Sequence, residues 1–205
     1  SMVAKYESFN PRFQKILTTI QQRLEPKPDI FAMLGAESCK QDVPPFLDIP
    51  NEELAGQLFL YELKIISLIE VKEFNNGAWT KADKSERAPN LTNFLNHFNT
   101  VTNWVSATIL SYTDVEKRSA VVRKFVDLIT VMFGQNNFTG YYEIYAGLNS
   151  SPISRLGKTW EAIPKYKKRL DKISATAAPT NNYSALRKVI SERLNGIYIP
   201  FMGLI

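Results

Sequence analysis

The sequence predicts an all-α fold, and three features of its pattern support this prediction. Apolar residues recur at intervals of three and four through most of the 205 residues, as they do on one face of a helix. Alternation of apolar and polar residues, which indicates a strand, is nowhere long enough to build a sheet. Prolines, asparagines and glycines separate the periodic segments, where helices would begin and end. The length suits a single multi-helix domain.

The first periodic segment lies near the N-terminus. Asn10 and Pro11 suit the cap and first turn of a helix whose apolar stripe reaches Leu24. Residues 26–48 lack periodicity and contain four prolines, which indicates an extended connector. We therefore expect residues 1–45 to form an N-terminal helix and a proline-rich connector, and residues 46–205 to form the main domain.

Two longer helices are predicted next. The first begins near Asn51, and its apolar stripe consists of Leu54, Leu58, Tyr61, Ile65 and Ile69. A turn is expected at residues 75–77, and a charged loop then leads to Ala88 and Pro89. The second helix follows this proline, and its stripe consists of Leu91, Phe94, Leu95, Phe98, Val101, Val105 and Ile109.

Shorter helices are expected in the second half of the chain. Thr113 and Glu116 match a capping box for a helix whose stripe is Val115, Val122, Phe125 and Ile129. Asn136 and Asn137 interrupt the pattern before a tyrosine-rich helix. Pro164 is expected to start a basic helix, and residues 179–182 to form a loop. A last helix over residues 183–194 should end at Gly196.

The segment over residues 147–160 is the most informative for function. Asn149 and Ser150 fall between the tyrosine-rich helix and a second helix start at Ser151, whose hydroxyl can cap free amides. Polar groups at such a break face outward on a rigid support and more often bind than pack. Residues 157–159 match the end of a phosphate-binding loop, but Pro152 occupies the position of its first glycine. A nucleotide-binding loop is therefore excluded.

Charge is concentrated late in the chain. Residues 155–193 contain ten Lys and Arg against three Asp and Glu, a local balance of +7, whereas the whole chain carries +5. Solvated helix faces explain this excess, and so would a surface for an acidic protein or an anionic membrane. Nucleic acid is not expected as a partner, because exposed-looking aromatics and glycines do not alternate with the basic residues.

Chemistry-bearing residues are scarce. The single histidine, His97, and the single cysteine, Cys39, cannot form a zinc site of the usual His/Cys type, so we expect no metal and no cofactor. A lone cysteine suits a reducing, cytoplasmic setting. We expect His97 to be a partly exposed helix residue, and the tryptophans at 79, 104 and 160 to be packing anchors. Covalent catalysis has little support.

Several blocks, in order, resemble the catalytic domain of Ras-type guanine-nucleotide exchange factors, the family that includes son-of-sevenless. The resemblance covers about residues 46–205, and its blocks are residues 49–58, 77–81, 88–91, 98–105, 136–138, 147–160 and 199–203. It implies an all-helical domain that catalyses no covalent reaction and needs no cofactor. Such a domain binds the switch II segment of a Ras-family GTPase, of Ras, Rap or Ral type, and stabilises the nucleotide-free state.

The resemblance also implies roles for particular residues. Asn149 matches the family asparagine that contacts the GTPase near switch II, and Leu95, Tyr183 and Phe201 match an apolar pocket for a switch II aromatic. Ser154 stands where some members carry an aromatic contact, which leaves that contact in question. Arg155, Pro152 and Trp160 match the frame of the motif. The alternative for Leu95 and Tyr183 is a role in the core.

One departure from the family pattern affects the functional expectation. The sequence stops at Ile205, where the resemblance places a helical hairpin that pries switch I from the nucleotide, so we expect the domain to be truncated there. The first hypothesis is an exchange factor that is cytoplasmic and recruited to the membrane of its GTPase. The alternative is a non-catalytic interaction module of the same fold, which binds a GTPase or a scaffold without exchange. A weak anionic membrane contact through residues 155–193 is compatible with either hypothesis.

Overall fold

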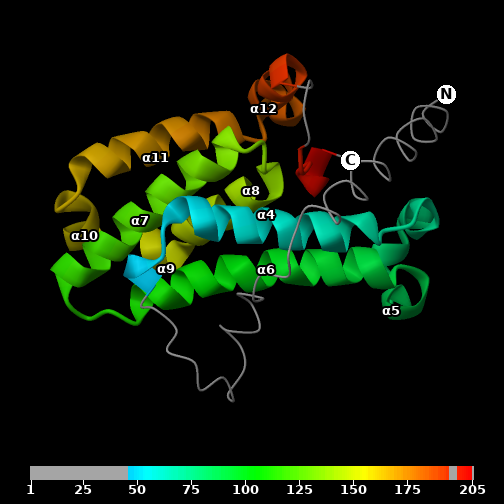
Figure 1. The fold of residues 1–205 in the computed structure, drawn as a ribbon, viewed down its shortest axis with the longest axis horizontal. Coiled ribbons are helices and arrows are strands. Elements are labelled where there is room, and N and C mark those ends of the chain that lie inside the picture. The colour runs from blue at the N-terminus through cyan, green and yellow to red at the C-terminus, as the bar shows by residue number, and fades with distance from the viewer. Residues whose placement is uncertain (1–45, 194–197, 205) are drawn as a thin grey trace. The chain divides into compact units, whose positions relative to one another are not determined.

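The structure, a computed structural model, describes residues 46–193 and 198–204. Helices make up nearly all the regular structure in these ranges, which confirms the all-α class (Figure 1). Within the same ranges, pairing of extended backbone is limited to one bridge between Asn137 and Ile199. The predicted N-terminal helix and the helix stop at Gly196 lie outside the described residues.

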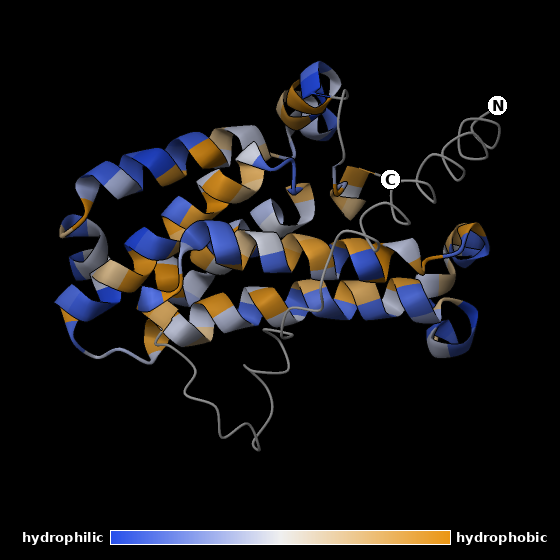
Figure 2. Ribbon diagram, in the orientation of Figure 1, coloured by the Kyte–Doolittle hydropathy of each residue, from blue (hydrophilic) through white to orange (hydrophobic). Residues whose placement is uncertain are grey.

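Four helices build the body of the domain: α4 (Asn51–Ser67), α6 (Pro89–Leu110), α7 (Val115–Gly134) and α8 (Phe138–Leu148). α4 and α6 run side by side along the long axis, and α8 packs against α4, α6 and α7 (Figure 1). Both α4 and α6 carry hydrophobic residues at intervals among hydrophilic ones, as expected for helices with one buried face (Figure 2). Most of the predicted stripe residues are buried: Leu54, Leu58, Ile65, Leu91, Phe94, Val101, Val105 and Ile109.

Two local predictions were wrong. The cap of α7 is Asp114, not Thr113, and its carboxylate accepts a hydrogen bond from the N–H of Lys117 at 2.8 Å. An aspartate at this position also interacts favourably with the positive end of the helix dipole. The predicted charged loop before Ala88 contains a short helix, α5 (Lys84–Arg87).

Helix α8 is the centre of the domain, because nearly all of its side chains are buried. Its Gly147 lies against α6, where an added Cβ would be 2.6 Å from Val105 Cβ and 2.9 Å from the Thr102 carbonyl oxygen. Ser106 on α6 donates a hydrogen bond to the Gly147 carbonyl at 3.2 Å. A residue without a side chain is therefore required for this close helix contact.

Shorter elements surround these four helices. They are η1 (Phe46–Asp48), η2 (Val71–Thr80), α9 (Ser151–Ser154), α10 (Gly157–Glu161), α11 (Pro164–Ala177), α12 (Thr180–Arg193) and η3 (Met202–Leu204). The predicted turn at 75–77 lies inside η2, where Asn76 and Gly77 adopt positive φ. The predicted loop at 179–182 becomes a left-handed turn at the start of α12, through Asn181, Asn182 and Tyr183. Among the described residues, no helix is both long and apolar enough to cross a membrane.

The buried carboxylate of Glu73 connects η2 to the first turn of α6. It accepts hydrogen bonds from the Leu91 N–H at 2.8 Å, from Asn90 Nδ2 at 2.9 Å and from the Glu70 N–H at 3.2 Å. Burial alone would raise the pKa of Glu73, but these hydrogen bonds together lower it from its ordinary value of 4.5. The stability that this carboxylate contributes is therefore complete above pH 4.5 and is lost as the pH falls through the lower folded-state pKa.

We predict that Glu73→Ala lowers the free energy of unfolding at pH 7 by about 2 kcal/mol, because it leaves several donors without their acceptor. Urea denaturation of both proteins at pH 7 and at successively lower pH measures the difference, which should shrink below pH 4.5. Glu53→Ala, at an exposed position of α4, is the control and should cost less than about 1 kcal/mol. If Glu73→Ala destabilised the protein equally at pH 7 and below pH 4.5, the result would contradict a lowered pKa of Glu73.

Candidate functional site

Asn149 directly follows α8, with an exposed side chain on a fixed backbone. Its N–H donates to the Tyr145 carbonyl at 2.9 Å, and its Nδ2 lies 3.5 Å from the Tyr145 hydroxyl. The next residue, Ser150, donates from its hydroxyl to the Gly147 carbonyl at 2.7 Å and lies 3.1 Å from the Ser106 hydroxyl. These bonds immobilise the backbone beside Asn149 while its amide faces solvent.

The motif after Asn149 forms a compact turn around α9. This helix begins at Ser151 as predicted, but Ser150 occupies the cap position and forms no side-chain cap bond, so the predicted Ser151 cap is wrong. Arg155 Nε donates to the Ser151 carbonyl at 3.1 Å, and the buried Trp160 donates from Nε1 to the Ile153 carbonyl at 2.9 Å.

Two further residues of this turn face solvent. Pro152 is exposed in the first turn of α9, and Ser154 is exposed near its end. The Ser154 hydroxyl donates to the Ser151 carbonyl at 3.2 Å. Arg155 and Trp160 therefore hold α9 by backbone contacts, and Ser154 presents only a small polar group beside them.

Three aromatic rings meet at the other end of α8, and we call them the aromatic cluster: Tyr142, Tyr183 and Phe201. The Phe201 ring stacks on the Tyr142 ring, with centroids 3.7 Å apart and planes inclined by 7°. Tyr183 contacts Phe201 edge-on at 5.5 Å and Tyr142 at 6.0 Å. Tyr142 is buried, whereas Tyr183 and Phe201 are half-buried and remain open to contact.

Backbone hydrogen bonds bring Phe201 to this position. The Phe138 N–H donates to the Ile199 carbonyl at 3.0 Å, and the Ile199 N–H donates to the Asn136 carbonyl at 3.0 Å. The Thr139 hydroxyl donates to the Pro200 carbonyl at 2.6 Å. The C-terminal segment is thus attached to the start of α8, which fixes Phe201 over Tyr142.

Leu95 belongs to a different group of residues. It is half-buried on α6 and packs, with Met202, against the apolar cluster of Ala78, Ala88 and Leu91. One turn later on α6, the Phe98 ring lies 6.3 Å from the Phe201 ring. The rings of Tyr183 and Phe201 are therefore in contact, whereas Leu95 packs in the Ala78 cluster.

Tyr142 is the residue that the sequence reasoning missed. It lies seven positions before Asn149, which puts both on one face of α8 about 10 Å apart. Tyr145 lies between them, with its ring 6.2 Å from the Tyr142 ring and its hydroxyl near Asn149. A search for residues at helical spacing from Asn149 could have found it.

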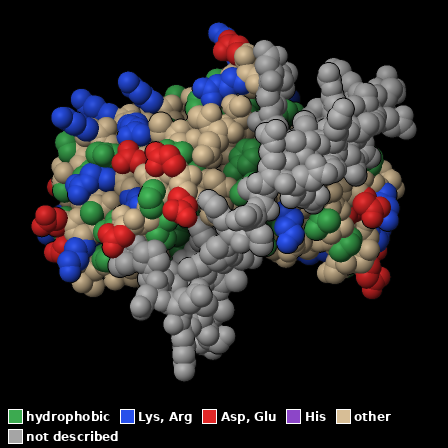
Figure 3. Space-filling view, in the orientation of Figure 1, with side chains coloured by type: hydrophobic (Ala, Val, Ile, Leu, Met, Phe, Trp, Pro, Cys, Tyr) green, Lys and Arg blue, Asp and Glu red, His purple; other side chains and the backbone are tan. Residues whose placement is uncertain are grey.

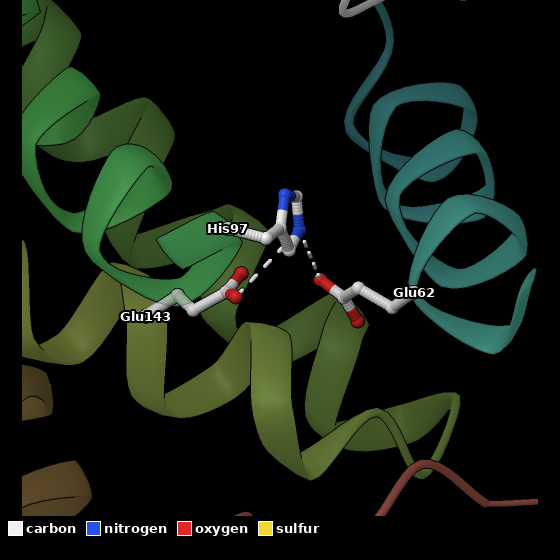
Figure 4. Close-up of side chains that lie close together, drawn as sticks. All are labelled: Glu62, His97 and Glu143. Atoms are coloured by element: carbon white, nitrogen blue, oxygen red, sulfur yellow. Dashed lines mark ion pairs between the residues drawn. The ribbon is translucent and has the colours of Figure 1, made fainter. Parts of the chain in front are cut away.

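A buried polar cluster consists of Glu62 on α4, His97 on α6 and Glu143 on α8 (Figure 4). His97 Nε2 lies 3.8 Å from Glu62 Oε1 and 3.7 Å from Glu143 Oε1. The expectation of a partly exposed His97 was wrong, because the residue is only 8% exposed. Burial, followed by the neighbouring Glu62, raises the pKa of Glu143.

A basic face follows α11. Lys167 pairs with Asp171, and Arg169 pairs with Asp127 at 2.6 Å. Lys165, Lys168 and Lys172 are exposed and lie three and four positions apart, so they share one side of the helix. No carboxylate in the described ranges pairs with these three lysines. Figure 3 shows basic side chains along the edge of the domain that α11 forms.

Comparison with known proteins shows which family has this arrangement. Residues 53–205 match the RasGEF domain family. The chain is 38% identical over 162 residues to "Ras guanine nucleotide exchange factor Q" of Dictyostelium discoideum, covering 78% of this chain and 12% of the relative. It is 34% identical over 161 residues to exchange factor P of that organism, covering 78% and 11%.

A vertebrate relative gives the same result. The chain is 34% identical over 160 residues to "Ras-specific guanine nucleotide-releasing factor 2" of Danio rerio, covering 78% of this chain and 13% of the relative. The chain thus spans about an eighth of the length of the curated relatives it matches. Since the matched region covers α6, α7, α8 and all but the first two residues of α4, the chain belongs to the RasGEF family of Ras-type guanine-nucleotide exchange factors.

Proposed function

We propose that this domain promotes GDP release and GTP loading on a Ras-family small GTPase by binding its switch II segment. The observation that carries the proposal is the exposed Asn149 directly after α8, together with the half-buried rings of Tyr183 and Phe201 over Tyr142. Asn149 and Tyr142 lie two helical turns apart within a domain that matches the RasGEF family. Half-buried rings and a fixed amide at this separation suit a segment that carries an aromatic side chain.

The two ends of this surface would contribute differently to binding. Tyr183 and Phe201 offer half-buried ring edges, and Tyr142 forms the floor beneath them, so a switch II aromatic would gain apolar contact there. The Asn149 amide offers donors and an acceptor in a fixed position. Leu95, which packs on the Ala78 cluster as Met202 does, would add apolar contact there, and Ser154 would present a small side chain in the turn after Asn149.

Exchange requires no covalent chemistry, because a partner that binds the empty GTPase better than the loaded one shifts the equilibrium. A GTPase that holds its nucleotide at picomolar affinity is stabilised by about 16 kcal/mol, so the exchange factor must replace much of that energy with its own contacts. An immobile docking surface contributes to this, because it loses little conformational entropy when it binds.

The function is tested by release of a fluorescent GDP analogue from Ras, Rap and Ral proteins in the presence of the 205-residue chain, with and without the family's helical hairpin joined after Ile205. We expect at least a tenfold faster release from one of them when the hairpin is present, since preferential binding of the empty state favours loss of the nucleotide. Binding without acceleration would instead support a non-catalytic interaction module. Absence of both across the panel would contradict the proposed function.

Substitutions of the predicted contact residues test the proposed surface. Asn149→Ala and Phe201→Ala should each reduce the acceleration about tenfold or more, with unchanged helical content by circular dichroism. Leu95→Ala should have a smaller effect, because Leu95 packs mainly against the Ala78 cluster. Glu86→Gln is the control and should retain full activity, since it is exposed on α5, which packs on η2 and α6. Full activity of Asn149→Ala would remove that residue from the surface.

We also propose a cytoplasmic location and recruitment to anionic membranes, where basic residues of α11 would contact lipid headgroups. The triple variant Lys165→Glu, Lys168→Glu and Lys172→Glu should abolish salt-sensitive sedimentation with phosphatidylserine vesicles, because each lysine near such a surface contributes about 1 kcal/mol. Vesicles of neutral lipid are the control. Equal sedimentation of the variant and the original chain would show that this face does not contact the membrane.

A further inference from the structure

Tyr183 has a backbone conformation that few tyrosines adopt. It is the last of three consecutive residues with positive φ, after Asn181 and Asn182, and its own φ is 56°. Asparagine tolerates this left-handed conformation, but the Cβ atom of a tyrosine comes close to the following carbonyl oxygen. Strained residues of this kind persist only where surrounding groups hold them, and they are concentrated at functional sites. The turn that presents the Tyr183 ring must therefore be held by other parts of the domain.

Apolar packing and local hydrogen bonds hold this turn only weakly. Every residue of α12 is described, and Leu186 is the only one of them that is buried. The Tyr183 N–H donates to the Pro179 carbonyl at 3.4 Å, and the Ser184 hydroxyl donates to the Thr180 carbonyl at 3.5 Å. Hydrogen bonds of this length are weak. A stronger contact is needed to keep the Tyr183 ring in place.

Arg187 provides this contact. Its Nε donates to the Asn182 carbonyl, inside the left-handed turn, at 2.9 Å, and its Nη2 donates to the Leu204 carbonyl of η3 at 3.0 Å. One guanidinium group therefore joins the segment that carries Tyr183 to the segment that carries Phe201. Hydrogen bonds from a charged donor are stronger than those between neutral groups. The planar guanidinium also presents donors in several fixed directions, which the single ammonium of a lysine does not.

We propose that Arg187 is a positioning residue that holds the Tyr183 ring against Phe201 and so prepares the aromatic cluster for a partner. Without Arg187, the turn is free to return to negative φ, which moves the Tyr183 ring away from Phe201. Phe201 itself would stay, because it stacks on Tyr142 and packs so closely on Gly203 that an added Cβ there would lie 2.4 Å from its ring. The effect on binding rests on the proposed function, whereas the effect on the Tyr183 ring does not.

The first test needs no GTPase. Nuclear Overhauser effects between the Tyr183 and Phe201 rings, whose centroids lie 5.5 Å apart, are measured in the 205-residue chain. We expect them in the original chain and in Lys188→Ala, the control that removes an exposed charge from the next position of α12. They should be lost in Arg187→Ala, with an unfolding midpoint within about 2 °C of the original chain.

A second variant keeps this test decisive if Arg187→Ala does not fold. Arg187→Lys keeps the charge but not the planar fork, so it should lose the Overhauser effects as well. A folded Arg187 variant with Overhauser effects equal to those of the original chain would overturn the proposal.

The second test measures what Arg187 contributes to binding. For the nucleotide-free GTPase of the Ras, Rap and Ral panel that the chain binds, Arg187→Ala should weaken the affinity about fivefold, because a mobile Tyr183 must be ordered on binding. The double variant Arg187→Ala with Tyr183→Ala should bind no more weakly than Tyr183→Ala alone, since Arg187 acts through Tyr183. Losses that add up in the double variant would contradict that route. If the original chain bound none of these GTPases, the proposed function would fail, and the Overhauser effects would still decide the role of Arg187.

Discussion

The close contact of α8 with α6 at Gly147 is the constraint on which the rest of the domain depends. Any side chain at this position would overlap Val105 and the Thr102 carbonyl, so only glycine allows the two backbones to approach. The short distance lets hydroxyls of α6 reach carbonyls of α8: Thr102 donates to Glu143 and Ser106 to Gly147. Apolar packing and hydrogen bonds therefore both hold α8 against α6. This contact makes α8 the central helix of the domain.

A central helix with nearly all its side chains buried determines what its ends can present. Asn149 is exposed because α8 ends there, and Tyr142 is two turns earlier under Phe201. Since the tyrosine hydroxyls at 141 and 142 donate to carbonyls of α11, the helix is held from that side as well. The candidate surface is thus rigid without a partner, which lowers the entropic cost of binding one.

The sequence predicted the helices well because each one must bury an apolar stripe, and such a stripe is visible in the local spacing. It predicted Asn149 as exposed for a related reason, since helix breaks also have local signals. Tyr142 and His97 were missed because their environments are set by distant residues. Tyr142 is covered by a ring only when Phe201 reaches it, and Tyr61, Glu62 and Glu143, which lie against His97, come from other helices. His97 does lie at helical spacing from Phe94 and Val101, but that spacing cannot identify its partners.

The buried polar cluster contributes something that an apolar core of equal volume would not. Apolar side chains tolerate small shifts of one helix along another, because dispersion contacts are individually weak and have no preferred direction. Glu62, His97 and Glu143 tolerate no such shift, because a displaced member would leave a buried charge without its neighbours. Three helices are therefore held at one register, and two of them, α6 and α8, contribute Phe98 and Tyr142 to the contacts of Phe201. The proposed function depends on this register, since a surface that deforms to fit the empty and the loaded GTPase equally well has no differential affinity for them.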